Sequence, residues 1–190
     1  IFPAAPPAEA PALSASIAHL AAHLVDEIEA QRDLQRAEQA DLATRPQNCS
    51  TLTLLQELIT LHRKTPAAHG KQLRLDPQAC DMVLRVDQRL LLRTLGNLLK
   101  NALEASSPLE PVTVGCDTNA ETVDFWIHNV QPMTRDVQLQ VFQRAFSTKG
   151  TGRGLGTYSA RLIGAHVLGG KVWFTSNRDD GTAFHIALPL

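Results

Sequence analysis

The first regular pattern of apolar residues in the chain lies between positions 14 and 42. Leu20, Leu24 and Ile28 recur every four residues, which places them on one face of a helix. Residues 1–13, in contrast, are mostly proline and alanine and predict an extended, poorly ordered leader. A helix of this kind cannot bury its apolar stripe alone. It packs either on its own domain or on another helix or a second copy of the chain, and we favour the latter because no helix of similar length precedes it.

Beyond residue 45 the pattern alternates between helical and strand periodicity. Helical spacing predicts segments over 53–69, 87–106 and 157–168, and alternation between turn residues predicts strands over 71–75, 81–86, 111–117, 122–128, 171–176 and 183–188. Hairpins are mixed with helices, so the expected fold is α+β, a two-layer α/β sandwich rather than a doubly wound sheet. We therefore divide the chain into the leader, a helical region over 14–45 and a globular domain over 46–190.

Composition excludes several classes of protein. Charged residues make up 19% of the chain and the net charge is −1, so no field of one sign indicates nucleic acid or anionic lipid as a partner. Cys49, Cys80 and Cys116 are scattered, which argues against a disulfide framework or a zinc site and fits a reducing cytoplasm. No apolar run approaches the ~20 residues that span a bilayer. The chain opens on Ile1 rather than Met, which indicates a processed or excised piece of something longer.

The long helix predicted over 87–106 carries a polar stripe. Arg93, Asn97, Asn101 and Glu104 fall on one side of an otherwise apolar segment. Asparagine costs a helix interior roughly 0.5 kcal/mol relative to alanine, so two of them four residues apart suggest side chains that meet something polar. An asparagine Oδ1 is a hard, neutral ligand that suits Mg²⁺ when the ion bridges phosphates. The competing interpretation is a stripe that faces solvent, and this helix alone does not decide between the two.

A glycine-rich stretch precedes the helix predicted over 157–168. Four glycines within residues 150–156 let the backbone come close to a ligand, and its N–H groups lead into a helix N-terminus that favours phosphate. The stretch has neither the Gly-Lys-Ser/Thr of a P-loop nor the preceding strand of a dinucleotide fingerprint. We interpret it as a phosphate cradle rather than a loop without a ligand. The cations and hydroxyls near it are Arg144, Lys149, Arg153, Ser147, Thr148 and Thr157.

Four linked motifs resemble those of the GHKL superfamily of ATPases, which includes histidine kinases, DNA gyrase and MutL. Residues 97–106 resemble its N box, 142–149 its F box, 152–156 its second glycine box and 181–184 its closing Gly-Thr-x-Phe strand. Their order and spacing agree over about residues 74–190, which is far more specific than any single motif. The closest subgroup is the sensor histidine kinases. Residues 25–32 also resemble the helix that follows the phosphoacceptor helix in some of them.

The resemblance implies a Bergerat-type sandwich that binds ATP under a mobile lid and follows a long helix of a dimerisation or phosphotransfer hairpin. The resemblance implies that Asn101 holds Mg²⁺ and that Asn97 lines the same phosphate pocket. Lys149 and the amides of residues 152–156 would enclose the phosphates, and Asn97 and Lys149 are the expected catalytic residues. Thr182 is expected to help position the adenine. The full set expected around the nucleotide is Asn97, Asn101, Glu104, Asn129, Arg144, Ser147, Thr148, Lys149, Gly152, Arg153, Gly154, Leu155, Gly156, Thr157 and Thr182.

Two features depart from the family pattern. The first glycine box is usually Asp-x-Gly-x-Gly, whose Asp accepts a hydrogen bond from the adenine amino group, whereas this chain has Asn129-Val-Gln-Pro-Met133. Asn129 still offers an accepting oxygen, although a neutral acceptor is weaker than a charged one. A phosphoacceptor His followed by an acidic residue is also missing, because leucines follow His19 and His23. The substrate histidine is therefore expected outside this chain segment.

The leading hypothesis is the ATP-binding catalytic domain of a cytoplasmic two-component sensor histidine kinase. Its expected partners are a phosphoacceptor helix, a response-regulator receiver domain and a second copy of the chain bound through residues 14–42. The main alternative is a degenerate, non-catalytic module that dimerises and transmits a signal. A third is an ATP-driven clamp of the gyrase or MutL kind, but those proteins use a Glu where Asn97 stands, so hydrolysis is not expected to be the main task.

Overall fold

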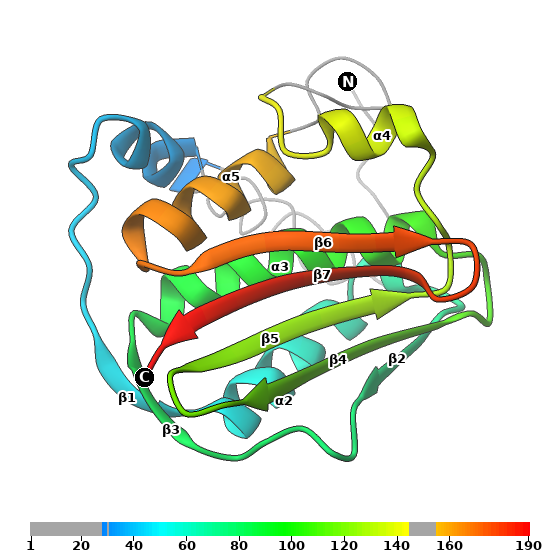
Figure 1. Ribbon diagram of the computed structural model, residues 1–190, viewed down its shortest axis with the longest axis horizontal. Coiled ribbons are helices and arrows are strands. Elements are labelled where there is room, and N and C mark those ends of the chain that lie inside the picture. The colour runs from blue at the N-terminus through cyan, green and yellow to red at the C-terminus, as the bar shows by residue number, and fades with distance from the viewer. Residues whose placement is uncertain (1–27, 30, 145–154) are drawn as a thin grey trace, which may run out of the picture.

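The computed structural model describes residues 28–29, 31–144 and 155–190 (Figure 1). Residues 28–29 and 31–38 are helical. The elements that follow are β1 (Gln47–Ser50), α2 (Thr51–Arg63), the 3₁₀ turn η1 (Pro66–Ala68), β2 (Gln72–Leu75), β3 (Val83–Val86), α3 (Gln88–Ala105), β4 (Pro111–Thr118), β5 (Thr122–Asn129), α4 (Arg135–Gln140), α5 (Gly156–Leu162), the π-helical turn η2 (Ile163–Val167), β6 (Lys171–Asn177) and β7 (Gly181–Pro189). None of the described helices is long and apolar enough to cross a bilayer.

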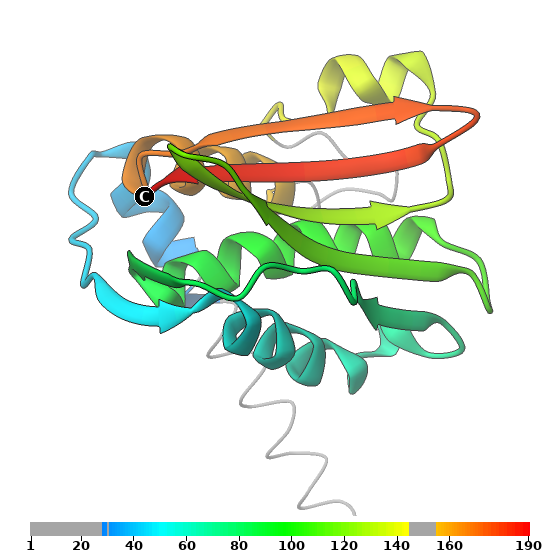
Figure 2. The same cartoon turned by 60° about the horizontal axis from the view of Figure 1, so that its bottom comes forward.

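The main sheet has five strands in the order β2-β4-β5-β7-β6. Strand β2 runs parallel to β4, and the other neighbouring pairs are antiparallel. A separate two-stranded sheet pairs β1 with β3. Helices α2 and α3 lie on one side of the main sheet (Figure 2), and α5 packs against both α3 and β6. The predicted α+β two-layer sandwich is therefore confirmed.

Side chains fix where the helices begin. Asp87 caps α3, because its Oδ1 accepts a hydrogen bond from the main-chain nitrogen of Leu90 at 3.0 Å. Its Oδ2 accepts a second hydrogen bond, from the main-chain nitrogen of Arg45 at 2.9 Å. Ser50 caps α2 in the same way by accepting from the nitrogen of Thr53. A cap of this kind contributes about 0.5–2 kcal/mol, and Asp87 also fixes the linker that leads to β1.

The hydrophobic core lies between the helices and the main sheet. Residues of β5 alternate in burial, so Val123, Phe125 and Ile127 belong to the same buried cluster as the apolar residues of the helices. The fully buried residues that α3 contributes are Leu91, Leu95, Leu98, Leu99, Ala102 and Leu103. Because these residues fill one broad face of α3, its polar stripe is left at the border of the core.

The opposite face of the main sheet carries the two tryptophans of the chain. Trp126 on β5 and Trp173 on β6 occupy positions that alternate with the buried ones. The Trp173 ring stacks on His185 with 4.8 Å between ring centroids. The Trp126 ring covers Gly115, where a Cβ would come within 2.3 Å of it, and its Nε1 donates to Asp117. Both indoles are thus held on the side of the sheet away from the helices.

The structure corrects three sequence-based expectations in the N-terminal part. The first helix ends at residue 38 rather than near 42, and the positive φ of Ala40 (56°) turns the chain there. Helix α2 ends at Arg63 rather than at 69, because Pro66 disfavours helical backbone in the residue before it. Strand β1 was not predicted at all.

The helix of residues 31–38 packs on its own domain. Ala37 forms a small buried cluster with Leu90 of α3 and Ile163, and Leu34 is buried as well. Sequence analysis favoured packing on another helix or a second copy of the chain. Within the described chain, this part of the stripe instead packs on its own domain. Residues 14–27 of the predicted helix lie outside the described residues.

Candidate functional site

The polar stripe on α3 borders the buried core. Arg93, Asn97, Asn101 and Glu104 are each half-buried, whereas most of the leucines between them are fully buried. The Nδ2 of Asn101 donates a hydrogen bond to the main-chain oxygen of Asn97 at 2.9 Å. Because this bond orients the carboxamide, Oδ1 of Asn101 is the side-chain atom that remains to accept from, or coordinate, a ligand.

The start of α5 lies directly beside the two asparagines. A Cβ on Gly156, the first residue of α5, would lie 3.7 Å from Asn97 Oδ1 and 3.8 Å from Asn101 Nδ2. Helices α3 and α5 also pack against each other. The fold thus brings the carboxamide pair next to the last glycine of the glycine-rich stretch, although the two segments are far apart in the sequence. Because Gly156 has no side chain, no Cβ stands between its main chain and the two carboxamides.

The middle of the glycine-rich stretch lies outside the described residues, and with it the predicted site residues Ser147, Thr148, Lys149, Gly152, Arg153 and Gly154. On its N-terminal side, Arg144 forms an ion pair with Glu38 at 3.2 Å. On its C-terminal side, the Thr157 hydroxyl donates to the carbonyl of Val141, and the Leu155 carbonyl accepts the first hydrogen bond of α5. The side chains of Arg144 and Thr157 are therefore engaged within the protein.

A second cluster of polar residues lies at one end of the neighbouring strands β5, β7 and β6. Asn129 and Thr182 are directly opposite each other in the β5–β7 register, and both are almost fully buried. The Thr182 hydroxyl donates to the main-chain oxygen of Gln131 at 2.8 Å. Because a hydroxyl has only one hydrogen to donate, the Ser176 hydroxyl, 2.8 Å from the Thr182 hydroxyl, is the donor in that second bond. Ser176 in turn accepts from the main-chain nitrogen of Met133 at 2.8 Å. This hydroxyl pair holds the segment that follows β5.

Sequence reasoning missed Ser176 and Gln131. Ser176 and Thr182 are paired in the register of the β6–β7 hairpin. The position of the turn in the sequence would therefore have been enough to predict that their hydroxyls lie side by side. Gln131 takes part through its main-chain oxygen, which also accepts from Asn129 Nδ2 at 3.4 Å. Because Gln131 acts through its main-chain oxygen, the type of its side chain gives no sign of this role in the sequence.

A metal ion fits this site only together with a ligand that brings its own oxygens. The described part of the chain contains no group of three or more His, Cys, Asp or Glu side chains that could hold a metal. Mg²⁺ commonly takes one or two protein oxygens and completes its shell with phosphate oxygens and water. Asn101 Oδ1 is a suitable single protein ligand for such an ion.

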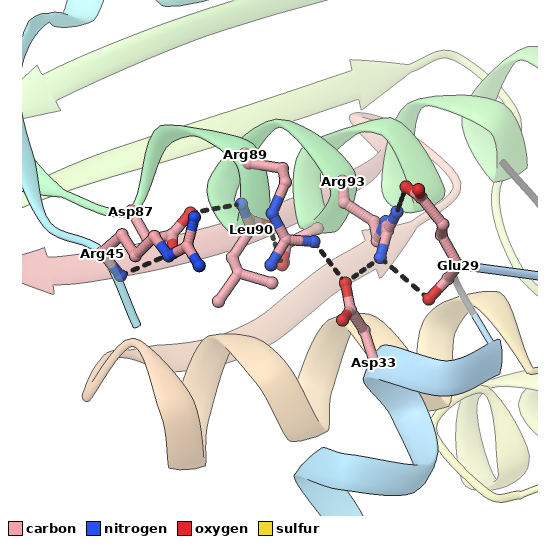
Figure 3. A network of polar contacts seen from close by, with 8 residues as sticks. Glu29, Asp33, Arg45, Asp87, Arg89, Leu90 and Arg93 are labelled. Atoms are coloured by element: carbon pink, nitrogen blue, oxygen red, sulfur yellow. Dashed lines mark hydrogen bonds and ion pairs between the residues drawn. The ribbon is translucent and has the colours of Figure 1, made fainter. Parts of the chain in front are cut away.

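The helix of residues 31–38 is joined to α3 one turn before the asparagines. Asp33 accepts from both Arg89 and Arg93, and its side chain is only 10% exposed (Figure 3). Arg93 also donates to the main-chain oxygen of Glu29 at 3.2 Å. Because Arg93 lies four residues before Asn97, the contact places the N-terminal helix beside the same helix that carries the candidate site.

Comparison with known proteins identifies the family to which the chain belongs. Residues 86–190, which contain α3 and everything after it, match the family model described as histidine kinase-, DNA gyrase B- and HSP90-like ATPase. The sensor protein FixL of Bradyrhizobium diazoefficiens is 37% identical over 143 residues, which cover 72% of this chain and 28% of FixL. The sensor protein DegM of Bacillus sp. is 29% identical over 153 residues, or 77% of this chain and 40% of DegM.

Solved structures show the same fold. The catalytic domain of the histidine kinase ThkA superposes with a TM-score of 0.68 at 23% identity, covering 77% of this chain and 96% of that domain. ThkA in complex with the response regulator TrrA matches with a TM-score of 0.66 at 18% identity, covering 87% of this chain and 48% of that chain. The chain spans well under half of the length of the two curated relatives. It belongs to the histidine kinase-, DNA gyrase B- and HSP90-like ATPases, and its fold is that of the catalytic domain of the histidine kinase ThkA.

Proposed function

We propose that this chain binds magnesium–ATP and presents the γ-phosphate to a histidine side chain that lies outside it. The observation that carries the proposal is the approach of Gly156 to Asn97 and Asn101, because it places two hard oxygen-bearing side chains beside a main chain with no Cβ. Close approach of phosphates needs such an uncovered backbone. The order and spacing of the N box, the F box, the second glycine box and the closing strand motif in the sequence also support the proposal.

Each residue of the site has a role in this proposal. Asn101 Oδ1 coordinates the metal, since its Nδ2 is already bonded to the Asn97 main chain. Asn97 lines the phosphate side of the same pocket, and Lys149 with the amides of residues 152–156 encloses the phosphates. The bound metal offsets negative charge on the phosphates. Catalysis then rests on positioning and electrostatics, and the attacking nitrogen is supplied by the substrate histidine.

The adenine is assigned to the group around Asn129. Its side chain and that of Thr182 face the helix layer from adjacent strands, and the Ser176 and Thr182 hydroxyls hold residues 131–133 in position. A carboxamide at Asn129 offers one accepting oxygen to the adenine amino group. Because it is uncharged, we expect a weaker hydrogen bond there than an aspartate would make.

The wider setting of the domain is also a proposal. The complex of ThkA with TrrA supports a response-regulator receiver domain as a partner of this chain too. We assign a homodimer to residues 14–42, whose apolar stripe includes Ile28, 54% exposed in the single chain. Three free cysteines and a substrate such as ATP favour the cytoplasm as the compartment. The substrate histidine is placed on a phosphoacceptor helix outside the chain segment.

Titration calorimetry with magnesium–ATP tests the proposal. We expect the 190-residue chain to bind with a dissociation constant below about 1 mM, and Asn101→Ala to weaken binding at least about tenfold, equivalent to about 1.4 kcal/mol. Lys100→Ala, an exposed neighbour on the same helix, is the control and should bind like the wild type. Unchanged affinity in Asn101→Ala would remove the metal role from that residue.

The same titration separates the second candidate function. A degenerate module that only dimerises and transmits a signal is favoured by Asn129, which replaces the family's acidic adenine acceptor. Such a module would show no heat of binding at millimolar nucleotide. Detectable binding by the wild type, followed by formation of an acid-labile phosphohistidine on an added phosphoacceptor region, would exclude it.

A further inference from the structure

Two of the three cysteines lie in direct contact although they are 36 positions apart. The Sγ of Cys80, in the segment between β2 and β3, is 3.2 Å from the Sγ of Cys116 on β4. A disulfide bond needs about 2.05 Å between the sulfurs, so a displacement of about 1 Å would join them. Cys49 shares no such contact, because its thiol donates to the carbonyl of Leu84 at 3.6 Å.

The main chain already holds the two cysteines at a suitable spacing. The nitrogen of Cys80 donates to the carbonyl of Cys116 at 2.9 Å. Main chains joined by a direct bond of this kind lie about 5 Å apart, within the window of about 4.4–6.8 Å between Cα atoms that a disulfide allows. The Cys80 carbonyl is fixed in addition by the Thr51 hydroxyl at 2.7 Å and by the Cys116 thiol at 3.1 Å. We therefore expect rotation of the two side chains to be enough to bring the sulfurs to bonding distance.

We propose that Cys80 and Cys116 form a reversible, peroxide-sensitive disulfide that bridges β4 and the segment before β3. Cys80 is half-buried and Cys116 is fully buried, so an oxidant reaches Cys80 first. The alternative is that both thiols only fill space as small apolar groups, which is the commoner role of buried cysteines. The inference does not depend on the proposed kinase function.

The chemistry proceeds in two balanced steps. The Cys80 thiol gives up its proton and attacks one oxygen of hydrogen peroxide, which leaves Cys80 as a sulfenic acid and releases water. The Cys116 sulfur then attacks the Cys80 sulfur, the S–O bond breaks, and the hydroxyl leaves as a second water with the Cys116 proton. The two thiols lose two electrons in total and the peroxide gains them. Burial, together with the contact with Cys80, raises the pKa of the Cys116 thiol to about 12, which fits its role as the second rather than the first sulfur to react.

The bridge lies at the end of the sheet away from the candidate site. Cys116 pairs with Phe125, whereas Asn129 pairs with Val112 at the other end of the same two strands. We therefore expect oxidation to leave nucleotide affinity unchanged and to raise the thermal midpoint of unfolding. The loop closed by the bridge is long, and constraint of the unfolded chain should raise the midpoint by about 5–10 °C.

Peroxide treatment of the 190-residue chain tests the inference. Before treatment, alkylation of the denatured protein should label all three free cysteines. After treatment we expect a single label, on Cys49. The intact mass of the treated protein, measured without alkylation, should be lower by about 2 Da. Dithiothreitol should restore all three labels and the original midpoint. Cys49→Ser should still form the bridge, and Cys80→Ser should not.

Three results would overturn the inference. One is three labelled cysteines after treatment, another is a bridge that contains Cys49, and the third is oxidation of Cys80 beyond the sulfenic acid without a bridge. Because Cys116 is a core residue and its replacement can impair folding, Cys80→Ser is the decisive variant. Its circular dichroism spectrum in the reduced state should match that of the wild type.

Discussion

Gly181 stands where the chain re-enters the sheet at the start of β7. Its φ is +75°, and a Cβ there would come within 2.4 Å of the Asn129 carbonyl oxygen and 2.7 Å of the Val130 Cα. These are main-chain atoms, so no change of rotamer can relieve the clash. Glycine at this position is therefore what allows Thr182 to lie directly opposite Asn129.

We expect Gly181→Ala to lower the free energy of unfolding by about 2–4 kcal/mol, because strain at positive φ adds to the main-chain clash. Gly169→Ala is the matched control: Gly169 has a similar φ of +70° but open space around it, so it should cost only about 1–2 kcal/mol. Urea unfolding followed by circular dichroism measures both losses. Equal losses in the two variants would contradict the close approach at Gly181.

At this scale the sequence identifies residues whose chemistry is unusual for their position. Asn97 and Asn101 could be predicted because asparagine is a poor choice for a mostly buried helix, and Gly156 because glycines cluster before a helix start. Ser176 could not, since a serine in a strand is ordinary until the hairpin register shows what lies opposite. Asp33 could not either, because its two arginine partners come from a distant helix.

The helix formed by residues 31–38 contacts the domain through both polar and apolar side chains. Asp33 receives hydrogen bonds from Arg89 and Arg93, while Ala37 makes the apolar contact with Leu90. Removing one partner of a nearly buried ion pair leaves the other charge without compensation, which destabilises the folded state. Asp33 thus contributes to the position of this helix, together with Glu38, which pairs with Arg144.

Asp33→Asn should loosen the helix of residues 31–38 while α3 remains folded. We expect hydrogen exchange of its amides to accelerate at least about tenfold, as expected for the loss of about 1.4 kcal/mol of local stability. Exchange in the centre of α3 should not change. Gln35→Ala, on the exposed side of the same helix, serves as control. Unaltered protection in Asp33→Asn would show that the apolar contact and the Glu38–Arg144 ion pair are sufficient to hold the helix.

Element prediction succeeded where periodicity and capping agree. Asp87 followed by an apolar run predicts α3 to within a residue, and alternation predicts the hairpin of β4 and β5. Strand β1 was missed because its four residues are too few for a periodic signal, and it exists through pairing with β3. The partner of the first helix could not be predicted, since an amphipathic stripe does not specify the surface that covers it.

At the scale of the whole molecule, His62 links stability to pH. The ring lies between α2 and α3: Nδ1 is 2.9 Å from the carbonyl of Leu58, and a Cβ on Gly96 would lie 3.0 Å from the ring. Burial lowers the pKa of His62 below its ordinary value of 6.5, more than its hydrogen bonds raise it. The unfolded chain therefore binds a proton at a higher pH than the folded domain does.

We expect the contribution of His62 to the free energy of unfolding to be fully present above pH 6.5 and to be lost as the pH falls from 6.5 towards the lower pKa of the folded state. His62→Gln should flatten the stability profile in that window, and replacement of the exposed His69 by Gln should leave it as in the wild type. Urea unfolding at pH 5 to 8 measures the three profiles. A profile of His62→Gln parallel to that of the wild type would contradict the assignment.

The overall architecture was predictable because four motifs and the alternation of helices and hairpins agree on one fold. What the sequence does not contain is the set of contacts between distant segments. The thiol pair of Cys80 and Cys116 is the clearest case, since the spacing of these cysteines suggests no bridge and only the pairing of a loop with β4 brings them together.

The placement of both indoles on the side of the sheet opposite α2 and α3 has a spectroscopic consequence. Trp126 and Trp173 are separated by the sheet from the side chains assigned to the nucleotide. Their emission should therefore change when the strands come apart and stay nearly constant when a nucleotide enters on the helix side. Intrinsic fluorescence can thus report unfolding in the presence of ligand, whereas a binding assay on this chain needs a labelled nucleotide or heat as its signal.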